Sequence, residues 1–244
     1  MRPATLLEIV PWMMLSAAVR VLSVQGGVTA LVVMQLSELF LFIAFLLAAR
    51  RMIEFTGGVT TLGQLSLLQQ VKLGRMILWR VVAVMVAGAA IVYLLGAHWI
   101  GLHMLLGFDG IAYDQQTLDG FLWSAFLAAF TLLMVLQVEQ SGRASPLGVF
   151  KELWKRSYYL APAIVVIFLA DIVLSIAQGT VRGIVFQFWT SDLAPTFVRA
   201  IVFYAFVFAF ASLRLWLTLA VLVFALRESY RRGPALPVPG VTPT

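Results

Sequence analysis

Three ionisable residues, Glu38, Asp171 and Arg214, lie in the middle of three long apolar runs. Counted from the inner end of its own run, each lies 12 to 14 residues in. At 1.5 Å per residue, this is about 18 to 21 Å from one face of a hydrocarbon layer about 30 Å thick. Charges at that depth are costly, so they usually pair inside a helix bundle or mark an ion or proton path. Two carboxyl groups and a guanidinium at one level predict a shared polar cluster.

Two interpretations of this cluster remain open. Arg214 stays protonated in any plausible environment and needs a counter-charge, and Asp171 on the preceding run is the nearest in sequence. A structural ion pair is the interpretation that we favour. If Glu38 completes a triad, one acid more than the base can neutralise favours a carboxyl that exchanges its proton. That arrangement would be a transport or proton-relay site.

Other chemistry is sparse. The chain has no cysteine, which excludes disulfides, thiolate metal sites and cysteine nucleophiles. The weak metal candidates are His98, His103 and Asp109, but the two histidines are five residues apart, not the three or four that puts both on one helical face. No hydrolase, phosphate-loop or intramembrane protease motif is present. We therefore expect no metal, no other cofactor and no enzymatic activity.

Composition predicts an all-α polytopic integral membrane bundle. The chain is 62% hydrophobic and 11% charged, with a mean hydropathy of +0.98, whereas soluble domains are about 25% charged. Six transmembrane helices are predicted, at 4–24, 28–49, 77–97, 120–138, 158–178 and 197–226. Glu8, Pro11 and Arg20 interrupt the first, which could instead be interfacial or re-entrant. The spans form a single transmembrane domain, 1–232, followed by a Pro-rich, extended tail, 233–244.

The connections carry further signals. Gln25, Gly26 and Gly27 predict a tight turn that makes spans one and two a close hairpin. The segment 179–196 is predicted to be a loop that caps the outer surface. Two amphipathic cytoplasmic lead-in helices are expected, at 62–76 and 146–157.

The second lead-in helix has the clearer pattern. Ser145 followed by Pro146 is a favourable N-cap and first helical residue. Its interfacial anchors are expected to be Lys151, Lys155, Arg156 and Trp154, which would hold it in the headgroup layer. The alternative is that both lead-in segments dock on a cytoplasmic partner such as an ATPase.

Lysine and arginine set the predicted orientation. With six spans, nearly all basic loop residues fall on one side, so both termini are expected to be cytoplasmic in a bacterial-type inner membrane. The net charge of +6 then reflects contact with anionic lipid, and no nucleic acid partner is expected. Our leading hypothesis is a non-enzymatic integral membrane subunit that binds lipids and other membrane-protein subunits. The alternative is a small permease or proton-coupled transporter, and the third is a membrane lipid-modifying enzyme.

Overall fold

The computed structural model describes residues 10–19, 36–37, 39–40, 42–49, 67–97, 100, 118–141, 145–191 and 194–232. These residues are helical apart from short turns and contain no strand. The labelled helices are α3 (Leu67–Leu94), α6 (Leu118–Ser141), α7 (Pro146–Lys155), α8 (Ser157–Thr190) and α9 (Thr196–Arg232). A shorter apolar helix, Val10–Val19, precedes them.

Four of these helices, α3, α6, α8 and α9, are long and apolar enough to cross a membrane. They correspond to the predicted spans 77–97, 120–138, 158–178 and 197–226. The prediction of an all-α chain with apolar helices of membrane-spanning length is therefore confirmed for the described residues. Spans 4–24 and 28–49 are described only in part, so six spans remain a prediction.

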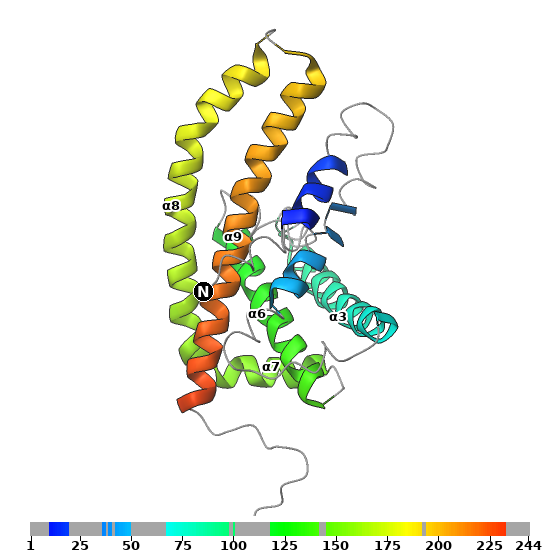
Figure 1. Ribbon diagram of the computed structural model, residues 1–244. Helices are drawn as coiled ribbons and strands as arrows, with labels where there is room; N and C mark the ends of the chain where they lie inside the picture. The colour runs from blue at the N-terminus through cyan, green and yellow to red at the C-terminus, as the bar shows by residue number, and fades with distance from the viewer. Residues whose placement is uncertain are drawn as a thin grey trace, which may run out of the picture.

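The α8–α9 hairpin dominates the structure. The two helices run antiparallel and side by side, joined by a short connection at residues 191–195 (Figure 1). The prediction of a loop at 179–196 is wrong, because α8 continues without a break to Thr190. Arg182 ends the apolar run, but it does not end the helix. The first proline after that point is Pro195, and Ser191 closes the helix by donating its hydroxyl to the Phe188 carbonyl at 2.8 Å.

The helix α7 begins as predicted. Ser145 is its N-cap and accepts a hydrogen bond from the Gly148 amide, and Pro146 occupies the first turn. The helix lies across the base of the α8–α9 hairpin, and the chain turns at Arg156 before α8 begins (Figure 1). The other lead-in segment differs over its described part, since α3 runs unbroken from Leu67 into the candidate span.

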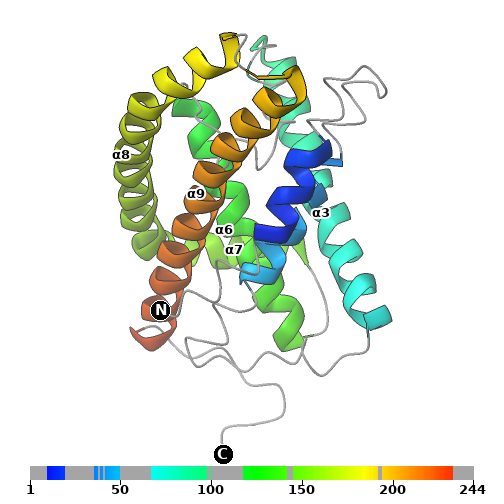
Figure 2. The same cartoon turned by 45° about the horizontal axis from the view of Figure 1, so that its top comes forward.

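The core is centred on α6, whose middle is almost completely buried by α3, α7, α8 and α9. The helix Val10–Val19 lies between α9 and α3 (Figure 2). It also packs against the second predicted span, where the hydroxyls of Ser16 and Ser37 are 2.5 Å apart and both residues are fully buried. The two segments are therefore neighbours, as expected of a hairpin, although the predicted turn at 25–27 lies outside the described residues.

Candidate functional site

The structure brings Asp171 and Arg214 together between α8 and α9. The Nε atom of Arg214 lies 2.7 Å from Oδ1 of Asp171, and its Nη2 atom donates a hydrogen bond to the Ser175 hydroxyl at 2.9 Å. Asp171 and Ser175 are four residues apart and thus share one face of α8. We call these three residues the α8–α9 polar triad.

The triad is enclosed by the helices that carry it. The side chain of Arg214 is 2% exposed and that of Asp171 is 20% exposed. A cavity of only about 10 Å³ borders the pair, and apolar residues such as Phe121, Ile167 and Leu217 form most of its wall. A single water molecule needs about 10 to 15 Å³, so this space is no larger than one water. The ion pair can hold α8 against α9, and the space beside it is too small for a solute.

The other residues predicted for the cluster and for metal binding cannot be placed. Glu38, His98, His103 and Asp109 all lie outside the described residues. A polar cluster of Glu38, Asp171 and Arg214 therefore remains a prediction. Within the part of the chain that the structure describes, no group of three or more histidine, aspartate or glutamate side chains is arranged to hold a metal ion.

The four expected interfacial anchors divide into two kinds. Lys151, Lys155 and Trp154 lie on the surface of α7, and Trp154 is 82% exposed. Arg156 differs from the expected surface position, because it is only 7% exposed. It sits at the turn between α7 and α8, where the change of chain direction points its side chain toward the end of α9.

Arg156 is the centre of a second polar cluster, which sequence reasoning missed. Its Nε atom donates to Oε2 of Glu152 at 3.1 Å, and its Nη1 atom donates to the hydroxyl of Ser229. The guanidinium carbon lies 3.6 Å from the centre of the Tyr230 ring, within the range of a cation–π contact. This cluster fastens the junction of α7 and α8 to the C-terminal end of α9. The missed signal was Ser229 and Tyr230, which follow the last apolar run by three and four residues.

A third polar contact holds α7 against α6. The side chain of Gln137 accepts a hydrogen bond from the Ser145 amide at 3.0 Å, in addition to the cap that Ser145 itself provides. A Cβ atom at Gly148 would lie 2.5 Å from Nε2 of Gln137, so glycine allows this close approach.

Comparison of the chain with protein-family models, with curated proteins and with solved structures finds no match.

Proposed function

We propose that this protein is a non-enzymatic integral membrane subunit of a larger membrane complex, and that the outer end of the α8–α9 hairpin is where a partner subunit docks. The observation that carries the proposal is the exposed apolar side chains at the end of the hairpin, on turns that we infer to extend beyond the hydrocarbon layer. Three steps support it: the length of the hairpin, the side chains at its end, and the enclosed geometry of the triad.

The hairpin is longer than a bilayer is thick. With 34 residues, α8 is about 51 Å long at 1.5 Å per residue. Tilted by 40°, the upper end of the usual range, it would still cover about 39 Å of depth, against a hydrocarbon core of about 30 Å. If Asp171 lies at the bilayer centre, Thr190 is about 28 Å from that centre, whereas the half-thickness is about 15 Å. The last turns of α8 then lie outside the hydrocarbon layer.

Those last turns carry large apolar side chains on their surface. Ile184 is 71% exposed and Phe186 is 55% exposed. Lipid tails cover such side chains only within the hydrocarbon layer. Burying each of these side chains is worth about 1.5 to 3 kcal/mol. A complex in which a partner protein covers them would therefore be stabilised by several kcal/mol. Apolar surface that is exposed outside the hydrocarbon layer marks an interaction site.

The triad supports a structural role inside the same hairpin. Its ion pair holds α8 and α9 in one register, and the bordering cavity of about 10 Å³ is too small for a substrate. The small permease or proton-coupled transporter is the alternative, and it requires a solute path elsewhere in the chain. In our proposal both termini are cytoplasmic, the membrane is a bacterial-type inner membrane, and α7 lies in the inner headgroup layer.

Co-purification from native membranes tests the proposal. The chain is tagged at its native expression level, extracted in a mild detergent and analysed by native mass spectrometry. The double variant Ile184→Ala with Phe186→Ala, called the tip variant, removes the exposed apolar side chains at the end of the hairpin. Val165→Ala with Val173→Ala is the matched control. The control side chains are 57% and 65% exposed but lie within the hydrocarbon layer, where lipid covers them. We expect stoichiometric partners with the wild type and the control, and their loss with the tip variant.

Two results would contradict the proposal. A wild-type chain that extracts alone, as a monomer or homo-oligomer, would remove the basis for a subunit. Partners that stay bound to the tip variant as firmly as to the control would show that the hairpin tip is not the docking surface. The transporter alternative would then be tested by reconstitution of the purified chain with Asp171→Asn.

A further inference from the structure

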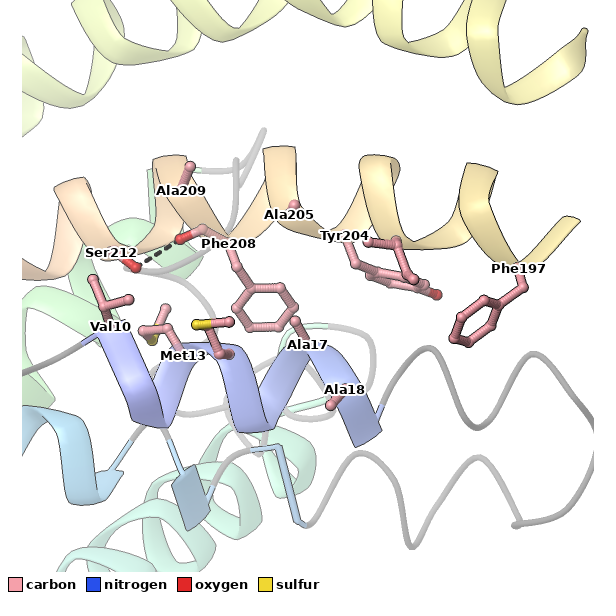
Figure 3. Close-up of a pocket in the computed structure, with 12 residues that line it drawn as sticks. Val10, Met13, Ala17, Ala18, Phe197, Tyr204, Ala205, Phe208, Ala209 and Ser212 are labelled. Atoms are coloured by element: carbon pink, nitrogen blue, oxygen red, sulfur yellow. Dashed lines mark hydrogen bonds between the residues drawn. The ribbon is translucent and has the colours of Figure 1, made fainter. Parts of the chain in front are cut away.

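A long apolar groove runs between the helix Val10–Val19 and the outer half of α9. Its volume is about 690 Å³. Figure 3 shows Phe197 and Phe208 pointing from α9 toward the shorter helix, with Met13 and Ala17 on the opposite wall. The groove lies on the face of α9 away from α8, so it is separate from the polar triad.

The lining of the groove favours an apolar ligand. Of the described residues around it, only Ser212 and Tyr204 carry a polar side-chain group. The hydroxyl of Ser212 already donates to the Phe208 carbonyl at 2.7 Å, as Figure 3 shows. A sugar, a lipid headgroup or a peptide with free polar groups would lose hydrogen bonds to water here and gain few in return. A hydrocarbon chain has no such loss.

The shape of the groove suits a lipid tail. From Phe197 to Ser212, the groove follows α9 for 15 residues, or about 22 Å. The groove is open along one side, so in a bilayer the surrounding acyl chains have direct access to it and no second protein is needed to fill it. A single acyl chain is thin enough to lie along the groove, which is long enough to follow the chain across one leaflet of about 15 Å.

The position of the groove along α9 matches the path of an acyl chain. Ser212 is two residues from Arg214, which the sequence places near the bilayer centre. Phe197 lies at the opposite end of the groove, close to the outer end of α9. Acyl chains extend from the membrane surface to the bilayer centre, and the groove covers the same interval. We propose that this groove binds one acyl chain of an outer-leaflet membrane lipid, with the headgroup at the Phe197 end. This lipid site does not depend on the proposed partner subunit.

Photochemical labelling tests the site in the full-length protein. The chain is reconstituted in phosphatidylcholine vesicles that contain a small fraction of a phosphatidylcholine with a diazirine in one acyl chain. After illumination, the labelled peptides are identified by mass spectrometry. We expect labels to concentrate on Val10–Val19 and on the segment 197–212. Labels spread evenly over the exposed apolar face of α8 would overturn the proposal, and this result needs no variant.

Filling the groove provides the second measurement. Ala209→Trp places an indole in the groove, and Ala177→Trp on the exposed surface of α8 is the matched control. We expect labelling of 197–212 to fall roughly tenfold with Ala209→Trp and to stay unchanged with Ala177→Trp, because the lost apolar contacts weaken binding by that order. Thermal unfolding of both variants checks that they fold.

Ala205→Phe is a smaller substitution that serves if Ala209→Trp does not fold. Labelling that both groove variants leave at the wild-type level would contradict a bound acyl chain. A dimer in native mass spectra that Ala209→Trp converts to a monomer would also contradict it, since a second copy of the chain would then occupy the groove.

Discussion

Replacing Asp171 with asparagine removes the negative charge that faces Arg214 while keeping the size and shape of the side chain. Arg214 is 2% exposed, so its positive charge has almost no access to solvent or headgroups. Removing one partner of a buried ion pair costs about 3 to 5 kcal/mol, because the attraction that offset the desolvation of the remaining charge is lost. Asp171 is 20% exposed, and Ser175 still accepts a hydrogen bond from Arg214, so the lower end of this range applies. We expect a loss of about 3 kcal/mol.

The matching double variant isolates the interaction. Asp171→Leu with Arg214→Leu replaces both charges by apolar groups, and such replacements are usually neutral or stabilising. We therefore expect the double variant to unfold within about 1 kcal/mol of the wild type, while each single variant is destabilised. The assay is thermal unfolding in nanodiscs, followed by tryptophan fluorescence. For a chain of this size, 3 kcal/mol corresponds to a fall in Tm of about 6 to 12 °C.

Two control variants test whether the loss of stability is specific to the ion pair. Ser175→Ala removes one hydrogen bond to a charged group and should cost about 1.5 kcal/mol, half of the effect of Asp171→Asn. Arg182→Leu removes an exposed arginine of the same helix and should change stability by less than about 0.5 kcal/mol. The ion pair does not hold the hairpin together if Asp171→Asn has the same Tm as the wild type. The same conclusion follows if the losses of stability of Asp171→Leu and Arg214→Leu alone sum to the loss of the double variant.

Three further outcomes are expected in the same unfolding assay. Gly148→Ala should cost about 1 kcal/mol, because the added methyl group displaces Gln137 and breaks its hydrogen bond to the start of α7, and protease cleavage between α6 and α7 should become faster. Tyr230→Leu should cost about 1 to 2 kcal/mol by removing the ring beneath the Arg156 guanidinium, whereas Tyr230→Phe should retain most of the stability. Ser16→Val should cost about 1 kcal/mol, because it removes the buried hydrogen bond between the hydroxyls of Ser16 and Ser37, and an unchanged Tm would contradict that contact.

Local signals in the sequence were enough to predict several elements. Ser145 and Pro146 predict the start of α7 because capping depends on adjacent residues alone. The apolar runs predict the four long helices because a helix satisfies its own backbone in lipid. The meeting of Asp171 and Arg214 follows from the cost of an isolated charge at that depth, although Ser175 was not predicted as a member of the site.

Features that depend on distant contacts could not be predicted in this way. The C-terminal end of α8 was missed because Arg182 and the glycines near it lower the local hydropathy, while the helix hydrogen bonds continue regardless of hydropathy. The burial of Arg156 depends on Ser229 and Tyr230, which are more than 70 residues away in the chain. The groove beside α9 arises from how Val10–Val19 packs, and no single segment encodes it.

The pairing of Asp171 and Arg214 also bears on how the chain enters the membrane. The two residues lie on consecutive helices joined by only a few residues. An aspartate or an arginine at the centre of a lone helix opposes insertion by about 2.5 to 3.5 kcal/mol. Together, the two helices can bury each charge against the other during insertion. We therefore expect α8 and α9 to leave the translocation machinery as one hairpin, so that a chain truncated after α8 would insert less efficiently than one that includes α9.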